Sequence, residues 1–441
     1  MVNEGVENLL ASKVFAVVGA SRGPEKVGHA IFKNLLANKH ILALPVNPNA
    51  VEILGKRCYK DLYEVPYNID CVIIAVKAEF VLEIMKQTAR RKIKNAIILS
   101  AGFSEAGNLK LEEEVLKIAG ENEISVMGPN CFGFIDTLRG INTTFFQGIP
   151  SSGGIAFISQ SGALGVGFLD LAIKEKIGLS GFASIGISMM LDFSDFIDYY
   201  SKDRNTKVIA LYIESLKEDR GRRFIDACLR CKKPILVLKA GKSVSGQKAS
   251  SSHTAALASD SGVYESMFRQ AGVIEVNSMR ELILSSEILS QPYNLGRRAC
   301  IVSNAGGLGV LASDALEKSG ILVPSLPPGV LERLNKVLPF GWSRNNPIDL
   351  VGDALADRYW QVLSRIDSEN WFDFFIVLLT PQYMTETEKT AELLTHLKKP
   401  VFACFYGGEK VESAVKFLKD KKISVFSDVS DLGVLGKLAG E

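Results

Sequence analysis

This sequence has little histidine, no excess of charge of either sign and no long apolar run. It holds four His among 441 residues, and its 51 basic and 49 acidic residues leave a formal net charge of +2. A chain so balanced lacks the electrostatic footprint of a protein that binds nucleic acid or an anionic membrane. Apolar runs such as FDFFIVLLT are about nine residues long, whereas a membrane-spanning helix needs about 20. We therefore expect neither a nucleic acid nor a membrane as partner.

Signals for secretion and for disulfides are missing as well. The N-terminus, MVNEGVENLLASKVF, has neither a basic start nor a long apolar core, so we expect no signal peptide and a cytoplasmic protein. Seven scattered cysteines, an odd number, do not form a disulfide framework. The CxxC at Cys228–Cys231 has no second CxxC or His pair to complete a zinc site, and buried structural thiols are the simpler interpretation. We expect no metal site in the chain.

The sequence does have apolar, β-rich runs that alternate with amphipathic segments. Hydrophobic residues make up 47% of the 441 positions, which is enough for large cores. A chain of this length favours roughly two to four domains. The runs form three series, which begin at 14–20, 153–162 and 299–307. Continuous apolar strands separated by helices indicate parallel sheets covered on both faces, so we predict an α/β protein with three doubly wound domains. Turn residues at 143–154 and 290–298 mark the boundaries.

Ligands of such sheets bind at the carboxyl ends of the strands, and the first candidate follows the first strand. VVGASRGPEKVGHAIFKNLL (17–36) has the pattern of a strand, a Gly/Ser turn and a helix. Its glycines are not spaced as G-x-G-x-x-G, and VNP (46–48) offers no Asp or Glu to a ribose 2′-hydroxyl, which disfavours NAD. Coenzyme A fits better, with its phosphates on Arg22 and Lys26. The alternative is a turn needed only for helix–sheet packing.

Two further strand ends carry candidate residues. In FISQSGALG, Ser161 and Gly162 open a helix whose free N–H groups suit a phosphate or phosphoryl group. The alternative is ordinary N-capping by Ser159 or Ser161. Glu214 ends the strand ALYIES, where an acid is usually solvated or salt-bridged, but it could orient a histidine ring by accepting its N–H. For the Gly-rich turn SNAGGLGVLASD (303–314), we favour a structural role or one facing a nucleotide.

One of the four histidines lies among small residues. His253 stands in KASSSHTAALAS (248–259), inside the Gly- and Ser-rich segment 241–262 that follows a strand directly. A lone histidine is most often a surface residue or one with its bonds satisfied. This segment offers the ring little to pack against, and we expect an exposed, mobile active-site loop. Because an imidazole has an unperturbed pKa of about 6.5, its neutral form is a competent nucleophile that accepts a phosphoryl group.

Eight motifs in a fixed order resemble one family. They are GASRGPEKVG, SAGFSEAG, MGPNCFG, ISQSGALG, KVIALYIES, SSSHTAALAS, FRQAGVIEV and SNAGGLGVLASD. Together they resemble the α subunit of NDP-forming acyl-CoA synthetases (acetate–CoA ligase, ADP-forming), relatives of succinyl-CoA synthetase. The resemblance covers essentially the whole chain. It implies a Rossmann-like CoA-binding domain at 1–145, a flavodoxin-like ligase domain with a phosphohistidine loop at 146–293, and a second flavodoxin-like ligase domain at 294–441.

The resemblance also implies site residues. The family's phosphohistidine falls on His253 and its supporting acid on Glu214. The implied phosphate site consists of Asn130, Ser161, Gly162 and Gly186. The implied CoA site follows the strand ends at Gly19, Ala20, Ser21, Arg22, Lys26, Val46, Asn47, Pro48, Val76, Lys77, Ser100, Ala101 and Gly102.

The implied reaction converts acyl-CoA (acetyl-CoA first), phosphate and ADP to a carboxylate, CoA and ATP. An acyl phosphate forms first, His253 takes its phosphoryl group, and the loop carries that group to the nucleotide. The family's ATP-grasp domain has no counterpart among these residues. The resemblance therefore implies a separate ATP-grasp β subunit that holds ADP and Mg²⁺, in an α2β2 assembly.

The chain departs from the family pattern at three places. It has HTAALAS for HTGALAG, GISMM after the strand at 182–186 where GN is usual, and AVKA for AVPA, which adds Lys77. In the second case we expect backbone to replace an amide donor near the phosphate. One alternative function is a non-catalytic, regulatory acyl-CoA-binding scaffold, but such relatives commonly lack the histidine. Another is a nicotinamide-dependent oxidoreductase, which the missing ribose acid disfavours.

Overall fold

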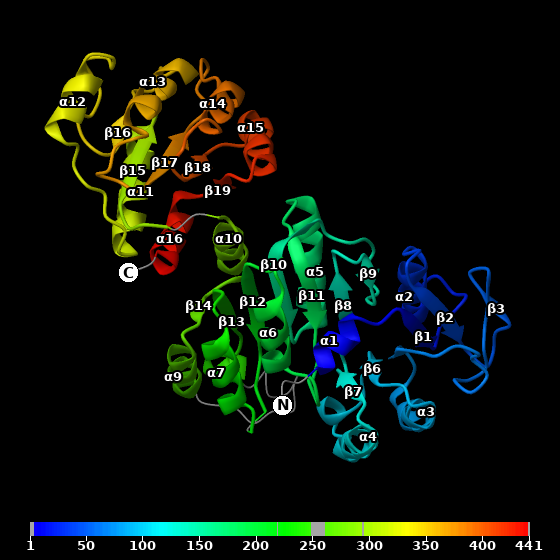
Figure 1. The fold of residues 1–441 in the computed structure, drawn as a ribbon. Coiled ribbons are helices and arrows are strands. Elements are labelled where there is room, and N and C mark those ends of the chain that lie inside the picture. Colours follow the sequence, from blue (N-terminus) through cyan, green and yellow to red (C-terminus); the bar gives the residue numbers. More distant parts are fainter. Residues whose placement is uncertain (1–3, 218, 248–260, 293–294, 440–441) are drawn as a thin grey trace. The chain divides into compact units, whose positions relative to one another are not determined.

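A computed structural model of the chain describes residues 4–217, 219–247, 261–292 and 295–439 (Figure 1). The chain divides into two compact units, Met1–Leu282 and Ile283–Glu441. The first unit contains two large sheets, and the second contains one. The α/β class and the three doubly wound sheets that the sequence predicts are thus confirmed.

The first sheet is entirely parallel, with the strand order β2-β1-β5-β6-β7. Alternate residues of β1 enter different cores, because Phe15 and Val17 pack on one face while Ala16 and Val18 pack on the other. Both faces are therefore buried, as the continuous apolar runs predict. The strands are β1 (Val14–Val18), β2 (Leu42–Val46), β5 (Cys71–Ile74), β6 (Asn95–Ile98) and β7 (Ser125–Met127). Its helices are α1 (Gly5–Leu10), α2 (Val27–Leu36), α3 (Ala78–Arg90) and α4 (Leu109–Glu121), and β3 (Glu52–Ile53) pairs with β4 (Lys56–Arg57).

The second sheet has seven strands in the order β14-β13-β12-β10-β11-β8-β9. Five of them are parallel, whereas β8 and β9 are antiparallel additions at one edge that the sequence pattern did not predict. The strands are β8 (Gly133–Asp136), β9 (Ile141–Asn142), β10 (Ser152–Ser159), β11 (Leu179–Ser184), β12 (Val208–Ile213), β13 (Ile235–Lys239) and β14 (Ile274–Val276). The helices are α5 (Gly162–Lys174), α6 (Phe193–Lys202), α7 (Gly221–Arg230), α9 (Ser261–Ala271) and α10 (Met279–Leu289).

The third sheet, in the second unit, is parallel with the order β16-β15-β17-β18-β19. Its strands are β15 (Ala299–Ser303), β16 (Ile348–Asp349), β17 (Phe374–Leu379), β18 (Val401–Phe405) and β19 (Ser424–Val425). Its helices are α11 (Gly306–Lys318), α12 (Pro328–Asn335), α13 (Ala356–Ile366), α14 (Thr387–Leu394), α15 (Glu409–Asp420) and α16 (Val434–Leu438).

All three sheets change winding direction beside their first parallel strand. In each, the first strand lies between the second and the third of its own series, so the loops after β1 and β5, β10 and β12, and β15 and β17 meet in pairs. These are the switch points, where doubly wound sheets bind ligands.

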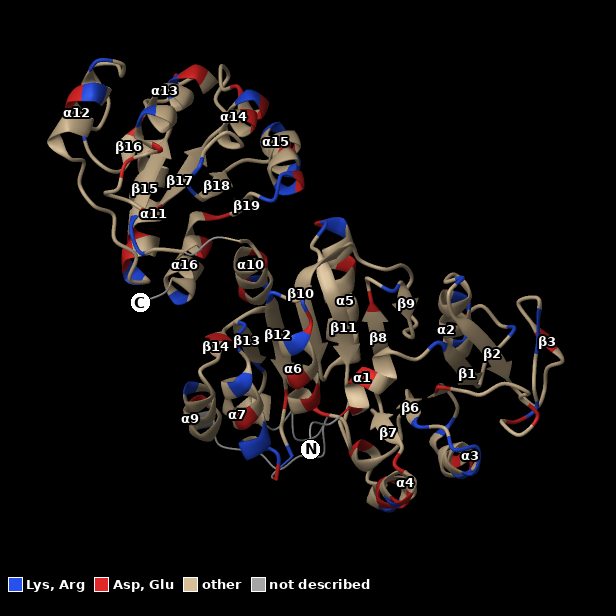
Figure 2. Cartoon of the chain, in the orientation of Figure 1, with Lys and Arg blue, Asp and Glu red and all other residues tan. Residues whose placement is uncertain are grey.

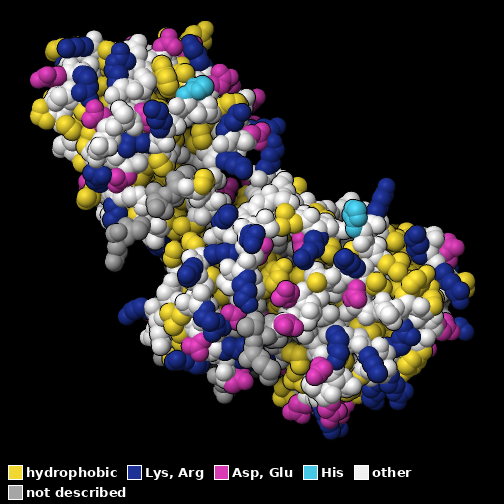
Figure 3. All heavy atoms as spheres, in the orientation of Figure 1, with side chains coloured by type: hydrophobic (Ala, Val, Ile, Leu, Met, Phe, Trp, Pro, Cys, Tyr) yellow, Lys and Arg dark blue, Asp and Glu magenta, His cyan; other side chains and the backbone are white. Residues whose placement is uncertain are grey.

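The strands are almost free of charge, and Lys, Arg, Asp and Glu lie mainly on helices and loops (Figure 2). On the face shown in Figure 3, basic and acidic side chains are interspersed. Within the described ranges, no helix is long and apolar enough to cross a membrane.

Candidate functional site

A cavity of about 600 Å³ lies at the switch point of the second sheet. Among its lining residues are Asn130, Ser161, Gly162, Gly186 and Glu214, which come from four segments that are far apart in the sequence. The first four are the residues predicted to bind phosphate, and Glu214 is the predicted supporting acid. The other lining residues are Val27, Leu99, Cys131, Phe132, Phe145, Gln160, Ala163, Val166 and Ile187.

One wall of the cavity is the start of α5. Ser161 is the N-cap, and its Oγ accepts a hydrogen bond from Leu164 N at 3.3 Å. Gly165 N reaches the Ser161 carbonyl at 3.1 Å, so the N–H groups of Gly162 and Ala163 precede the first bonds of the helix. Capping and anion binding are therefore compatible here: the cap satisfies one donor, and the N–H groups of the first turn, with the positive end of the helix dipole, still favour an anion.

Glu214 is held in this cavity through its backbone. Its side chain is buried, and its own N–H donates to Gln160 Oε1 at 2.6 Å. The Nζ of Lys239 donates to the Glu214 carbonyl at 2.9 Å. Burial, together with the neighbouring carboxylate of Glu214, raises the pKa of Tyr212 to about 12. The backbone of the acid is thus fixed from two sides, while its carboxylate group stands at the cavity.

Another part of the cavity lining combines two turns that follow strands of different sheets. Asn130 and Gly186 both have positive φ, +50° and +57°, and a Cβ on Gly186 would lie 2.2 Å from the carbonyl oxygen of Pro129. This contact requires glycine at 186. Ile187 N donates to that same carbonyl at 3.0 Å, and Met189 N donates to Gly128 O at 2.9 Å. In the GISMM segment, these amides are therefore already bonded and do not replace the amide donor of the family pattern.

Apart from Gln160, the remaining lining of the cavity is apolar. Phe132 and Phe145 are in ring contact, with centroids 4.1 Å apart, and Val27, Val166 and Ile187 lie on the same cavity. Among the described residues that line it, Glu214 alone carries a charge. Such a wall suits an uncharged organic group beside a phosphate. Sequence patterns missed these residues because apolar side chains at strand and helix ends carry no site signature.

The predicted CoA residues lie along the carboxyl edge of the first sheet. They follow β1, β2, β5 and β6, which are neighbours in that sheet. Two hydrogen bonds tie these turns together: Asn47 Nδ2 donates to Ala20 O at 2.8 Å, and Ser100 Oγ donates to Val76 O at 2.6 Å. Arg22, Lys26 and Lys77 are exposed beside them. The fold therefore brings all the turns predicted for CoA to one edge.

The glycine turn after β1 also has a packing role. A Cβ on Gly28 would lie 2.0 Å from the carbonyl oxygen of Gly19, so α2 approaches β1 too closely for any side chain at that position. The packing interpretation raised by the sequence is thus correct for Gly28. Packing at Gly28 does not require the exposed charges of Arg22 and Lys26. The same turn can therefore pack α2 against β1 and bind a ligand.

His253 and the HTAALAS departure lie outside the described residues. Burial raises the pKa of the Cys228 thiol to about 12 and also raises that of Cys231, which disfavours the reactive thiolate form. Within the described part of the chain, no three His, Cys, Asp or Glu residues form a group that could hold a metal ion.

Comparisons with known proteins match this arrangement domain by domain. Three family models match in succession: a CoA binding domain at 13–137, a succinyl-CoA ligase like flavodoxin domain at 152–289 and a Ligase-CoA domain at 299–438. The chain is 36% identical to the acetate–CoA ligase (ADP-forming) II subunit alpha of Pyrococcus furiosus, over 95% of this chain and 93% of that protein. The chain belongs to the ADP-forming acetate–CoA ligase family. The resemblance indicated by the eight motifs is therefore confirmed.

Members of this ADP-forming acetate–CoA ligase family differ in length. The chain is 37% identical to acetate–CoA ligase (ADP-forming) I of Archaeoglobus fulgidus over 98% of this chain, but it spans only 63% of that protein. Among solved structures, it is similar to Ca. Korarchaeum cryptofilum dinucleotide forming acetyl-coenzyme A synthetase 1 in complex with phosphate and ADP. That match has a TM-score of 0.93 at 33% identity, over 99% of this chain and 96% of the other.

Proposed function

We propose that this chain is the α subunit of an ADP-forming acyl-CoA synthetase, which converts acyl-CoA, phosphate and ADP to a carboxylate, CoA and ATP. Acetyl-CoA is the substrate that we propose first, from the names of its relatives. The observation that carries the proposal is the cavity in which Asn130, Ser161, Gly162, Gly186 and Glu214 meet. It joins a helix N-terminus that favours an anion, a buried acid and an apolar wall.

The proposed chemistry has three transfers. A phosphate oxygen attacks the thioester carbonyl carbon, the C–S bond breaks, and CoA leaves as the thiol after taking a proton. A ring nitrogen of His253 then attacks the phosphorus of the acyl phosphate, and the P–O bond to the carboxylate breaks. A terminal phosphate oxygen of ADP finally takes the phosphoryl group from His253, which restores the free imidazole. Splitting one transfer into steps through a covalent intermediate is the usual role of such a nucleophile.

Each site residue has a proposed task in these steps. The N–H groups at the start of α5 bind the phosphate, and Asn130 and Gly186 form the facing wall. Glu214 accepts the N–H of the His253 ring, which fixes its tautomer and stabilises the phosphorylated, more positive ring. CoA lies along the turns after β1, β2, β5 and β6, with Arg22 and Lys26 on its phosphates.

We propose that a separate ATP-grasp β subunit holds ADP and Mg²⁺, in an α2β2 assembly. The name "subunit alpha" of two Pyrococcus furiosus relatives supports a partner, and the longer relatives, of which this chain spans less than two thirds, are single chains. We place the activity in the cytoplasm, where CoA thioesters and ADP are available. If the purified chain alone made ATP from acetyl-CoA, phosphate and ADP, the proposed partner would be unnecessary.

Phosphoenzyme formation tests the proposal without the partner. The chain is incubated with acetyl-CoA and ³²P-phosphate, and we expect acid-labile label on the peptide that spans residues 241–262, together with release of CoA. His253→Asn removes the nucleophile, so it should give no label. Equal labelling of His253→Asn and the wild type would overturn the mechanism. Binding of acetyl-CoA without any labelling would favour the regulatory scaffold instead.

A further inference from the structure

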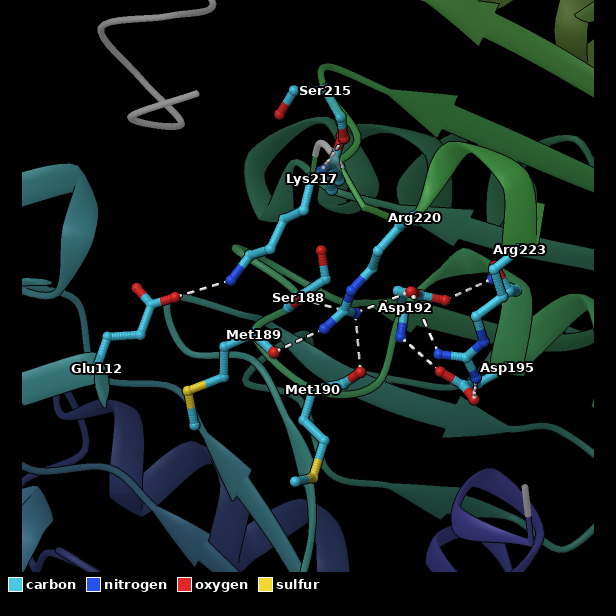
Figure 4. Close-up of polar contacts among 12 residues, drawn as sticks. Glu112, Ser188, Met189, Met190, Asp192, Asp195, Ser215, Lys217, Arg220 and Arg223 are labelled. Atoms are coloured by element: carbon cyan, nitrogen blue, oxygen red, sulfur yellow. Dashed lines mark hydrogen bonds and ion pairs between the residues drawn. The ribbon is translucent and has the colours of Figure 1, made fainter. Parts of the chain in front are cut away.

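Three consecutive backbone carbonyls converge on the side chain of Arg220. Its Nη1 donates to Ser188 O at 3.3 Å and to Met190 O at 2.9 Å, and its Nη2 donates to Met189 O at 2.9 Å. The same Nη1 lies 2.8 Å from Asp192 Oδ2. Figure 4 shows the guanidinium group enclosed by these acceptors. The side chain of Arg220 is only 17% exposed, so these bonds are largely shielded from water.

The segment 187–191 is held on its other side by the first sheet. The N–H groups of Ile187, Met189 and Leu191 donate to Pro129 O, Gly128 O and Val126 O at 3.0, 2.9 and 3.1 Å. Three of its N–H groups therefore face the CoA-binding domain, and three of its carbonyls face Arg220. Because Gly186 and Ile187 line the cavity, this segment is the continuation of the cavity wall.

Arg220 also belongs to the chain segment that begins at the proposed acid. It precedes α7 as its N-cap residue, a few positions after Glu214. In the same segment, Lys217 Nζ lies 2.8 Å from Glu112 Oε1 of α4, which is a second link to the CoA-binding domain (Figure 4). The Arg220 guanidinium thus joins the wall at Gly186 to the segment that carries Glu214.

We propose that Arg220 is a positioning residue, which sets the distance between the phosphate wall at Gly186 and the acid Glu214. The proposal rests on the proposed function and names a residue that acts through the wall rather than on the substrate. A displacement of about 1 Å at a reacting centre lowers a rate by as much as about a hundredfold, so a group that fixes this wall affects the chemistry without touching it.

Arginine suits this task and lysine does not. A guanidinium carries five N–H donors in a fixed plane and reaches several carbonyls at once, whereas an ammonium is a compact point charge. Asp192 balances the charge of Arg220 and is itself fixed, since its Oδ1 accepts from Ser194 N at 2.8 Å as the N-cap of α6. Arg223 lies 3.6 Å from Asp192 Oδ2 and pairs with Asp195 as well. The acidic partner of the Arg220 guanidinium is therefore held in place by its own contacts.

Arg220→Lys tests the proposal, with Arg222→Lys as its matched control. Arg222 is on α7, the helix that Arg220 precedes, and its side chain is 76% exposed beside Asp226. The initial rate of ³²P labelling is measured at several phosphate and acetyl-CoA concentrations. We expect Arg220→Lys to lower the rate at subsaturating phosphate by about ten- to a hundredfold, with half-saturation by acetyl-CoA within about twofold of the wild type. Arg222→Lys should match the wild type in both.

A second variant separates positioning from folding. Asp192→Asn keeps the cap on Ser194 and the three carbonyl bonds of Arg220 but removes the balancing charge. Its labelling rate at subsaturating phosphate should therefore lie between the rates of Arg220→Lys and Arg222→Lys. Equal labelling of Arg220→Lys and Arg222→Lys would overturn the proposal. If Arg220→Lys does not fold, wild-type phosphate dependence in Asp192→Asn would overturn it instead. Absence of labelling in the wild type would count against the proposed function itself.

Discussion

The side-chain oxygen of Gln160 accepts a hydrogen bond from the backbone N–H of Glu214 at 2.6 Å, although 54 residues separate them in the sequence. The same Oε1 accepts from Ser215 N at 2.9 Å, while Nε2 donates to Ser215 O at 2.8 Å. One amide side chain at the end of β10 thus fixes the backbone at the end of β12. These bonds hold the backbone of Glu214 and do not involve its carboxylate, which neighbours Tyr212.

The third sheet repeats this construction at its own switch point. Asn304 follows β15 as Gln160 follows β10, and its Oδ1 accepts from Thr380 N at 2.9 Å. Its Nδ2 donates to Thr380 O at 2.9 Å. The position of Glu214 is taken by Thr380, which is not an acid. This clamp, in which an amide side chain at one strand end holds the backbone at another, therefore occurs in two domains. An ionisable residue, Glu214, occupies the held position only in the domain of the second sheet.

Replacing Gln160 by Leu should destabilise the chain. The buried N–H of Glu214 and the partly buried N–H of Ser215 would lose their acceptor. We expect a loss of about 2–4 kcal/mol in free energy of unfolding, because an unsatisfied buried group costs about 1–3 kcal/mol and a partly buried one costs less. Urea unfolding followed by circular dichroism measures the loss. Gln270→Leu, at an exposed position of α9, is the control and should change the midpoint little. A midpoint for Gln160→Leu equal to that of the control would contradict the clamp.

Replacing Glu214 by Gln should separate catalysis from stability. The backbone bonds to Gln160 and Lys239 remain, so we expect the urea midpoint to stay close to that of the wild type. Labelling of His253 should fall by about a hundredfold or more, since positioned acid–base groups contribute about 10²–10⁴ in rate. Glu265→Gln, exposed on α9, is the control for loss of one negative charge. Labelling of Glu214→Gln within threefold of the wild type would remove Glu214 from the mechanism.

Adding a methyl group at Gly28 should weaken CoA binding. The new Cβ would lie 2.0 Å from the carbonyl oxygen of Gly19 and would push α2 away from β1. Overpacking of this kind costs about 1–3 kcal/mol, and the displaced turn carries the proposed CoA phosphate ligands. Gly120→Ala in α4 is the control, because a Cβ there meets nothing within 4 Å. Calorimetric titration with CoA should show lower affinity for Gly28→Ala alone, and equal affinities would argue against a CoA site at this turn.

Asp373 should make the second unit sensitive to acid. Burial by itself would raise the pKa of this carboxyl, but hydrogen bonds from the side chain and backbone of Arg298 outweigh burial and lower the pKa. A carboxyl with a lower pKa in the folded state binds fewer protons than in the unfolded state. Its stabilisation is therefore present above about pH 4 and is lost as the pH falls through the folded-state pKa.

The variant Asp373→Asn measures this contribution. At pH 7 it should be less stable by about 1 kcal/mol, since a partly exposed ion pair is screened by solvent, and the difference should disappear as the pH falls below the folded-state pKa. All three tryptophans of the chain, Trp342, Trp360 and Trp371, lie in the second unit, so their fluorescence follows its unfolding. Asp357→Asn, at an exposed ion pair with Lys389, is the control. A difference that persists unchanged at low pH would contradict the assignment.

The sequence by itself determined the fold class and most of the parallel strands, while the roles of the site residues stay predictions. Apolar runs predicted the parallel strands because buried strands need continuous hydrophobic residues. Ser161 and Gly162 were recognisable because a cap followed by glycine has a local signature. The short strands β3, β4, β8, β9 and β16 escaped prediction, since runs of two to four residues carry no periodic pattern. His253 was found from its unusual surroundings in the sequence, and its role stays a prediction.

Only the tertiary structure decided which residues meet. Asn130, Gly186 and Glu214 reach one cavity because the two sheets present their strand ends to it, and no local pattern encodes that distance. The apolar wall of Val27, Phe132 and Phe145 was invisible in the sequence, because apolar residues look alike whether they fill a core or line a site. Gln160 and Arg220 were missed for a related reason: a clamp is defined by the backbone groups it reaches, and those lie in distant segments that only folding brings within hydrogen-bonding distance.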